Sequence, residues 1–402
     1  MAREAVRKAL ALDPNLGEAH AALAWIQQFD DQDWAGADAS YRRALELGPG
    51  NAIVISHAGT LSRIVGRFSE AVALGRRAMQ LDPVNPGNYQ NAGVTFYYAG
   101  LYDEAAAAII GPSGSPNSMA ALQFIAEAKT PMLAPVGTTA VVLPMDEQKR
   151  WVFKTTQNDD LICQALVAHM VKTGVKTVGF IGFGDAYGES WYRVFTSMID
   201  KAGVKLIVNE RFQRTDQSVI GQATKIAAAN PDAVLIAAAG GPTVLPHTTL
   251  VERGYKGQIY QTHGAATPDF VRLGGKAVDG AVMAASLMLV LDEVPDSNPS
   301  KKVALDYIAA YEKIYGTKPA TFGANVYDAG LLLQRAVPEA LKKAQPGTEA
   351  FRGAMRDALE GTRDLVGTQG VYNMSPADHS GFDKRGRELM QLTNGVWRVI
   401  PE

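Results

Sequence analysis

The hydrophobic positions of the chain follow one pattern before about residue 108 and another after it. In the first part, apolar side chains recur at helical spacing. From Ile109 onward, short continuous apolar runs alternate with amphipathic stretches, which is typical of buried parallel strands separated by helices. We therefore expect a multi-domain chain, all-α over residues 1–108 and α/β over residues 109–402.

The helical part repeats itself. The segments "VRKALALDPN", "YRRALELGPGN" and "GRRAMQLDPVN" are three versions of one phrase. Equivalent residues stand 34 positions apart: Ala37, Ala71 and Ala105; Ala44 and Ala78; Pro49 and Pro83. That period is the period of tetratricopeptide repeats, which this segment resembles. A generic alanine-rich helical bundle is the alternative.

The residue types fit such a repeat. Small side chains let neighbouring helices approach closely, aromatic side chains fill the space between units, and prolines end helices. The small residues are Gly59, Gly93, Ala71 and Ala105, the aromatic residues are Trp34, Phe68 and Tyr102, and the prolines are Pro49 and Pro83. Arrays of this kind bind peptides or partner helices, so a protein partner of the repeats is expected. As the sequence is written, we expect an array with an incomplete first unit, an incomplete last helix and no polar cap.

Strands and helices alternate in the second part. Helices are expected at residues 161–172, 191–201, 301–315, 322–343 and 349–360. Strands are expected at residues 130–135, 151–156, 176–183, 204–210, 232–239, 257–262, 280–286, 370–374, 388–393 and 396–401.

Composition narrows the function classes. Hydrophobic residues make up 47% of the chain and the net charge is −2, so no charge excess recruits nucleic acid or an anionic membrane. The single cysteine, Cys163, excludes an internal disulfide and a cysteine-built metal site, and its neighbours place it on the buried face of a helix.

The N-terminus has no continuous apolar segment of the signal-peptide kind, so the chain as written is expected in the cytoplasm. The longest apolar run, Gly280–Leu291, is shorter than the ~20 residues that span a bilayer.

No motif supports an enzyme, a cofactor or a metal. In "GFIGFGDAYG", Gly182 and Gly184 are followed by Gly188, which stands one position late for a dinucleotide-binding loop, and Asp185 would face the pyrophosphate. The loop "GPSGSPNS" lacks the lysine of a phosphate-binding loop and the pattern of an esterase elbow. None of the six histidines has a partner at zinc-binding spacing.

The loop "GPSGSPNS" nevertheless suits an anion. Ser115 followed by Pro116 predicts an N-cap and a first-turn proline for the helix that follows. Free N–H groups at a helix N-terminus, together with a serine hydroxyl, favour a carboxylate. The alternative is a cap that serves only its own helix.

Several segments taken together resemble a known family. The run "IIGPSGSPNSMAALQFIAEAKTPMLAPVGTT", followed by "WVFKTTQND", "VGFIGFGDAYGESWYRVF", "LVERGYKGQIYQTHG" and "ATFGANVYDAGLLLQRA", resembles the Leu/Ile/Val-binding family of type I periplasmic binding proteins, which serve branched-chain-amino-acid ABC transporters. The resemblance implies two α/β lobes that close on a ligand without making or breaking a bond. It assigns residues 109–155 and 300–345 to the N-lobe, and residues 156–299 and 346–402 to the C-lobe. The family's first strands are missing here, so the N-lobe should expose an unpaired strand edge.

The resemblance also implies a set of ligand-binding residues. The G-P-x-x-S loop supplies Ser113, Gly114 and Ser115, the next loop supplies Val136, Gly137 and Thr138, and Tyr187 covers the ligand. Amino-acid binders carry a glutamate where this chain has His263, followed by Gly264, and a pocket tyrosine where it has Gly241 and Pro242. Loss of the glutamate removes the charge partner of an α-amino group. The "QTHG" segment is similar to that of family members that take up aromatic carboxylates, unless His263 hydrogen-bonds only within its own loop.

Three function classes follow. The first is a solute-binding protein for a small carboxylate, aromatic rather than a branched-chain amino acid, that works with ABC transporter permease subunits. The second is a cytoplasmic interaction or sensor protein, in which the repeats bind a partner and the truncated binding domain is regulatory or inactive. An enzyme ranks last, because no nucleophile, acid–base pair or metal cluster emerges.

Overall fold

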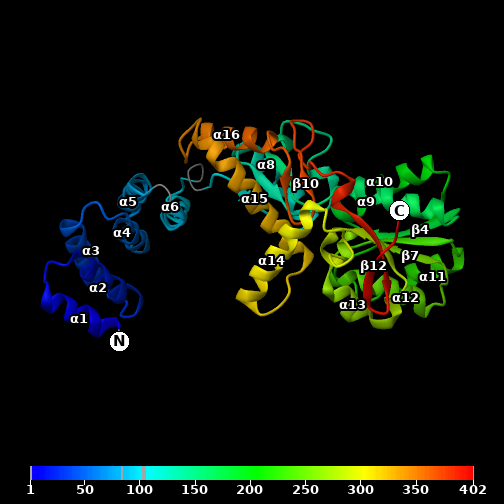
Figure 1. Cartoon of the computed structure of the whole chain (residues 1–402), viewed down its shortest axis with the longest axis horizontal. Helices are drawn as coiled ribbons and strands as arrows, with labels where there is room; N and C mark the ends of the chain where they lie inside the picture. Colours follow the sequence, from blue (N-terminus) through cyan, green and yellow to red (C-terminus); the bar gives the residue numbers. More distant parts are fainter. Residues whose placement is uncertain (1, 83–84, 102–105, 402) are drawn as a thin grey trace. The chain divides into compact units, whose positions relative to one another are not determined.

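The computed structural model describes residues 2–82, 85–101 and 106–401. They form two compact units (Figure 1). The first comprises Met1–Ala107 with Gln345–Glu349, and the second comprises Ala108–Ala344 with Ala350–Glu402. Within the described residues, no helix is both long and apolar enough to span a membrane.

The first unit is all-helical, as the sequence predicts. Its helices are α1 (Ala2–Leu12), α2 (Gly17–Phe29), α3 (Trp34–Leu47), α4 (Ala52–Ile64), α5 (Phe68–Leu81) and α6 (Pro86–Tyr98). The side chains of Asp33 and Asn51 accept hydrogen bonds from the free N–H groups at the starts of α3 and α4, which explains why these helices begin there. Helix α2 packs on α3, α4 on α5, and α5 on α6.

The small residues of the repeat lie where these helices meet. Ala37, Ala71 and Ala78 are fully buried. A Cβ atom on Gly59 would lie 3.2 Å from the Cβ of Leu74 in α5, and one on Gly75 would lie 3.2 Å from the Cβ of Ala92 in α6. Both contacts are tighter than ordinary packing, so glycine at these positions allows the helices to approach closely.

Of the aromatic residues predicted to fill gaps between units, those that the structure describes are only partly buried. Trp34 and Phe68 are 41% and 38% exposed. Each is the first residue of its helix, where the side chain lies at the edge of the packed layer. The predicted counterparts Pro83, Tyr102 and Ala105 lie outside the described residues.

We expect Ala71→Leu to destabilise the helical unit by about 1–3 kcal/mol, because the larger side chain has no space between α4 and α5. The matched control is Ala73→Leu, two residues along the same helix on its exposed face, which should change stability by less than about 0.5 kcal/mol. Scanning calorimetry of both variants measures the difference. Equal transitions for the two variants would contradict the predicted close packing.

The second unit contains a small parallel sheet with strand order β1-β2-β3. The strands are β1 (Ile109–Ile110), β2 (Met132–Ala134) and β3 (Val152–Lys154), and helix α8 (Ser115–Glu127) connects the first two. Within the described part of the chain, β1 pairs only with β2, and Ile109 and Ile110 are 37% and 43% exposed. This open edge agrees with the expectation for a lobe that lacks its first strands.

A larger sheet follows with strand order β12-β11-β8-β7-β6-β4-β5. Its strands are β4 (Thr177–Phe183), β5 (Lys205–Phe212), β6 (Ala233–Ala237), β7 (Gln258–Gln261), β8 (Val282–Ala285), β11 (Glu388–Thr393) and β12 (Val396–Val399). Strands β4 to β8 run parallel, whereas β11 is antiparallel to β8 and β12. The helices are α9 (Asp159–Lys172), α10 (Ala186–Lys201), α11 (Ile220–Ala229), α12 (Val244–Glu252) and α13 (Pro268–Gly274). Every residue of β6 is buried, as its continuous apolar run predicts, and Cys163 is buried in α9.

The chain crosses between the two sheets three times. It leaves the small sheet after β3, returns after β8 through α14 (Pro299–Tyr315) and α15 (Thr321–Leu341), and reaches the large sheet again at β11. Helix α16 (Glu349–Glu360) and the ribbon of β9 (Leu365–Val366) and β10 (Val371–Tyr372) precede the last crossing.

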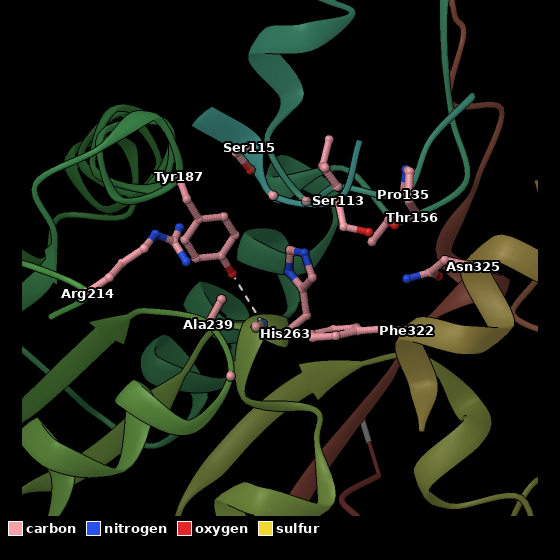
Figure 2. A pocket seen from close by; sticks show the side chains of 15 residues that line it. Ser113, Ser115, Pro135, Thr156, Tyr187, Arg214, Ala239, His263, Phe322 and Asn325 are labelled. Carbon is pink, nitrogen blue, oxygen red and sulfur yellow. Dashed lines mark hydrogen bonds between the residues drawn. The ribbon is translucent and has the colours of Figure 1, made fainter. Parts of the chain in front are cut away.

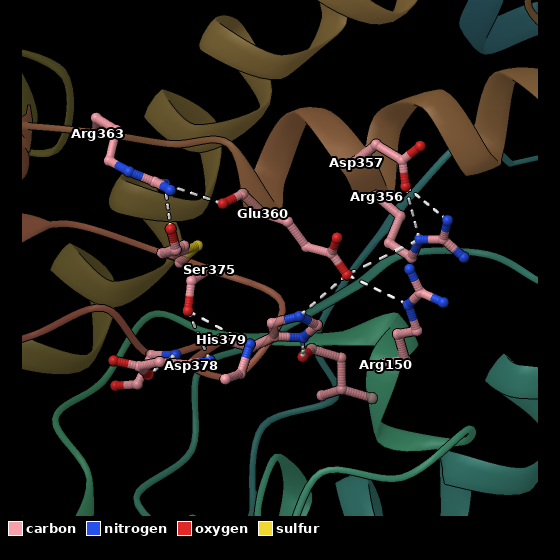
Figure 3. A network of polar contacts seen from close by, with 12 residues as sticks. Arg150, Arg356, Asp357, Glu360, Arg363, Ser375, Asp378 and His379 are labelled. Carbon is pink, nitrogen blue, oxygen red and sulfur yellow. Dashed lines mark hydrogen bonds and ion pairs between the residues drawn. The ribbon is translucent and has the colours of Figure 1, made fainter.

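The sequence assigned all of residues 346–402 to the C-lobe. In the structure, the chain first runs along the small sheet and reaches the large sheet only at β11. The ring of His379 stacks on Phe153 of β3 at 4.1 Å between centroids, and its Nδ1 lies 2.8 Å from the carbonyl oxygen of Val152. Glu360 Oε1 lies 3.4 Å from His379 Nε2 and 3.5 Å from Arg150 Nε (Figure 3). These contacts hold α16 and the segment after it against the small sheet, which continuity of the sequence alone does not reveal.

Candidate ligand-binding site

Loops that follow successive parallel strands meet around one cavity of the second unit (Figure 2). Ligands of open α/β sheets bind at the carboxyl ends of the strands, and this cavity lies there. Its volume is about 270 Å³. The lining residues are Ser113, Gly114, Ser115, Pro135, Val136, Gly137, Thr156, Tyr187, Arg214, Ala239, Gly240, His263, Gly264, Phe322 and Asn325.

The start of α8 forms one wall, but not with the predicted cap. Ser115 is the first residue of the helix, and Gly114 occupies the N-cap position with φ 94°. No side chain caps this helix end. The glycine takes the non-helical position because a left-handed φ is strained for other residues. The Ser115 hydroxyl is therefore not used as a cap, and it lies at a helix N-terminus that favours an anion.

The loop after β2 forms the second wall and is held from behind. The carbonyl oxygen of Gly137 accepts a hydrogen bond of 2.5 Å from Nζ of Lys154, which is fully buried. The next residue, Thr138, does not line the cavity, and its hydroxyl accepts a hydrogen bond from the N–H of Ala140 at 3.3 Å. A buried charge-assisted hydrogen bond of this kind fixes the position of the Gly137 peptide.

Tyr187, at the start of α10, covers the cavity with its ring. Its hydroxyl donates to Oγ1 of Thr262 at 2.9 Å and accepts from the N–H of Gly264 at 3.2 Å. Burial raises the pKa of this phenol, so it stays protonated. Since the hydroxyl is already bonded on the large-sheet side, the aromatic face of Tyr187 is the surface left for a ligand.

His263 lines the cavity and lies close to two aromatic rings. Its ring centroid is 6.1 Å from that of Tyr187 and 5.6 Å from that of Trp191. Within the described residues, neither ring nitrogen has a hydrogen-bond partner, so the imidazole is not engaged within its own loop. Burial, with a further contribution from the nearby Lys154 charge, lowers its pKa to about 3, and it is neutral at physiological pH.

Arg214 supplies the charge of the lining. Its Nε donates to Oδ2 of Asp185 at 2.6 Å, and its guanidinium stacks over Phe183 at 4.2 Å from the ring centroid. Asp185 is in turn the N-cap of α10, accepting from the N–H groups of Tyr187 and Gly188. The lining contains no Asp or Glu, so it offers no carboxylate to a cationic ligand group, and the Arg214 charge is itself paired with Asp185.

Behind this wall, Asp159 joins elements of both sheets. Its Oδ2 accepts from Ser190 Oγ in α10 at 2.6 Å and from the N–H of Thr139 at 3.3 Å. Burial raises the pKa of the Asp159 carboxyl and lowers that of the Lys154 ammonium, and the attraction between the two charges opposes both shifts. Through its two hydrogen bonds, Asp159 holds the loop after β2 against α10.

The predicted site residues divide into two groups. Ser113, Gly114, Ser115, Val136, Gly137, Tyr187, His263 and Gly264 line the cavity, whereas Thr138, Gly241 and Pro242 do not. Gly241 and Pro242 instead begin a short 3₁₀ turn next to Gly240. The sequence reasoning missed Pro135, Thr156, Arg214, Ala239, Gly240, Phe322 and Asn325. Most of them follow the ends of parallel strands, which is the signal that could have located them.

Other polar clusters do not suggest chemistry. His169 contacts the hydroxyl of Tyr260 at 2.8 Å, and His247 contacts the amide of Gln261 at 3.2 Å. In the part of the chain that the structure describes, no group of three His, Cys, Asp or Glu side chains could hold a metal ion.

Comparison with known proteins decides the family. The family described as periplasmic binding protein matches residues 80–386. An extracellular ligand-binding receptor from Rhodopseudomonas palustris HaA2 is 41% identical, with a TM-score of 0.72 over 79% of this chain and 88% of that chain. The chain belongs to the periplasmic binding protein family.

Further solved structures agree with this assignment. A second extracellular ligand-binding receptor from Rhodopseudomonas palustris HaA2 is 37% identical over 80% of this chain and 88% of that chain, with a TM-score of 0.71. A leucine-binding protein from Thermotoga maritima MSB8 shares the fold at 22% identity, with a TM-score of 0.62 over 79% of this chain and 84% of that chain. None of the curated proteins matches the chain.

Membership of the periplasmic binding protein family means that the second unit binds a ligand without transforming it. The family match begins at residue 80, near the end of α5, and so takes in α6, which the sequence reasoning assigned to the repeats. No repeat family matches the preceding helices.

Proposed function

We propose that this protein is the substrate-binding component of an ABC-type uptake system and that its ligand is a small aromatic carboxylate without an α-amino group. The observation that carries the proposal is the charge of the lining, which includes Arg214 and no acidic side chain. An α-ammonium group would enter this cavity without a charge partner, which is costly away from water. Neutral His263 does not replace the missing carboxylate.

The shape of the cavity supports an aromatic ligand. Tyr187 and Phe322 present rings to the space, and Pro135 and Val136 add apolar surface. At the end of the cavity where Ser115 lies, called the Ser115 end, the free N–H groups at the N-terminus of α8 can bind a carboxylate. The two R. palustris relatives are named only as extracellular ligand-binding receptors, and the T. maritima protein, at lower identity, is named as leucine-binding.

Ligand-induced change in melting temperature tests this proposal. The panel contains benzoate, cinnamate and 3-phenylpropanoate on one side and leucine, isoleucine and valine on the other. A ligand present at 100 times its Kd stabilises a protein by about 2.7 kcal/mol, so aromatic acids should raise Tm by several degrees. A shift with leucine and none with the aromatic acids would overturn the ligand assignment. No shift with any compound would favour a partner-binding protein with an inactive binding domain.

We also propose that the first unit is a tetratricopeptide-like array that binds a protein segment. The support is the 34-residue spacing and the buried small residues at that spacing, Ala37 and Ala71. Such arrays present one face of stacked helices to a partner.

A further inference from the structure

The far end of the cavity is polar and carries no charge. A second cavity of about 10 Å³ shares Thr156, His263, Phe322 and Asn325 with the first, but not Ser115, Tyr187 or Arg214. Its remaining lining is Gln157, Ala266, Ala285, Ser286, Thr321 and Gln369. The four shared residues therefore mark this end, where the two cavities adjoin.

Polar atoms at this end lack partners. Thr156, His263 and Asn325 are each at least 95% buried. Within the described residues, Thr156 Oγ1 and both ring nitrogens of His263 have no hydrogen-bond partner. The amide nitrogen of Asn325 points toward the cavity in Figure 2. Because Thr156 and His263 also line the cavity, these unpartnered polar groups are available to a ligand group.

The orientation of Asn325 is fixed by the fold. Its Oδ1 accepts a hydrogen bond from Nε2 of Gln369, which lies just before β10. Its amide nitrogen is thereby left as the donor on the cavity side. Thr156 lies in the first crossing between the sheets and Asn325 in α15, so a group bound between them would contact two of the segments that join the lobes.

We propose that this far end, formed by Thr156, His263 and Asn325, binds an uncharged hydroxyl or carbonyl group that the ligand carries opposite its carboxylate. The inference rests on the proposed function, since it assumes that the carboxylate lies at the Ser115 end. A charged group is disfavoured, because neither Thr156, neutral His263 nor Asn325 could offset its desolvation. The ligand class is then an aromatic acid with a hydrogen-bonding substituent in the 4-position.

Calorimetry with two matched acids tests the proposal, namely 3-phenylpropanoate and 3-(4-hydroxyphenyl)propanoate. In the unmodified protein, the hydroxylated acid should bind about tenfold more tightly, as expected for one well-made buried hydrogen bond. Thr156→Val should remove most of this preference, so that the two acids bind with similar affinity. The variant is expected to fold, because the Thr156 hydroxyl has no partner within the described residues.

The matched control is Thr155→Val. The Thr155 hydroxyl is equally buried and also without a partner in the described part of the chain, but Thr155 lines neither cavity. This variant should keep the tenfold preference. Equal binding of the two acids by the unmodified protein would overturn the inference alone, and so would a loss of affinity for both acids in Thr156→Val with the preference intact. Failure of both acids to bind would overturn the proposed function together with it.

Discussion

Replacing Asp159 with alanine is expected to lower the free energy of unfolding of the α/β unit by about 3–5 kcal/mol. The substitution leaves the Lys154 ammonium buried without its principal counter-charge, and it removes the acceptor used by Ser190 Oγ and the N–H of Thr139. A buried charge that loses its partner costs far more than an exposed one. In scanning calorimetry, Tm of this unit should fall by roughly 5–15 °C.

Asp160→Ala is the matched control, since Asp160 lies next along the chain in the first turn of α9 and also acts on the Lys154 charge. Its loss should cost less than about 1 kcal/mol, the usual contribution of an acidic residue to a helix N-terminus. A double variant, Lys154→Met with Asp159→Leu, should recover part of the stability lost in Asp159→Ala, because no charge is then left buried. If Asp159→Ala lowered the free energy of unfolding no more than Asp160→Ala does, Asp159 would not hold the loop after β2 against α10.

Gly137→Ala is expected to weaken ligand binding by roughly 10- to 100-fold. The added Cβ would lie 2.3 Å from Nε2 of His263 and 3.1 Å from Cε2 of Tyr187. The Lys154 hydrogen bond prevents the Gly137 peptide from retreating, so the rings must move into the cavity. Overpacking of this kind costs about 1–3 kcal/mol, and each 1.4 kcal/mol is a factor of ten in Kd.

Gly241→Ala serves as the comparison for this variant. Its nearest neighbour would be Cδ1 of Leu273 at 3.6 Å, an ordinary contact, and the affinity should stay within about twofold. Isothermal titration with 3-phenylpropanoate measures both variants. Unchanged binding by Gly137→Ala would place the ligand elsewhere than between His263 and the loop after β2.

Much of the fold follows from local pattern. Continuous apolar runs such as β6 predict buried parallel strands, and the resemblance placed Ser115, Tyr187 and His263 around one cavity. The structure brings these three residues together because parallel strands place their carboxyl ends at the same edge of a sheet.

The failures have different physical causes. The side of the last crossing depends on contacts such as that of His379 with Val152, which are 227 residues apart in sequence. Asn325 joins the cavity only because a helix of the returning segment is placed beside the crossing strands. The cap of α8 was misplaced by one residue, since Gly114 can take a left-handed φ that the serine next to it does not need.

Isothermal titration of the full chain with 3-phenylpropanoate and with phenylalanine tests the central claim most directly, because the two compounds differ only in the α-amino group. The cavity lined by Arg214, with no acidic side chain, predicts that 3-phenylpropanoate binds at least tenfold more tightly. Tighter binding of phenylalanine would contradict the claim, because it would require a partner for an ammonium group that this lining does not provide.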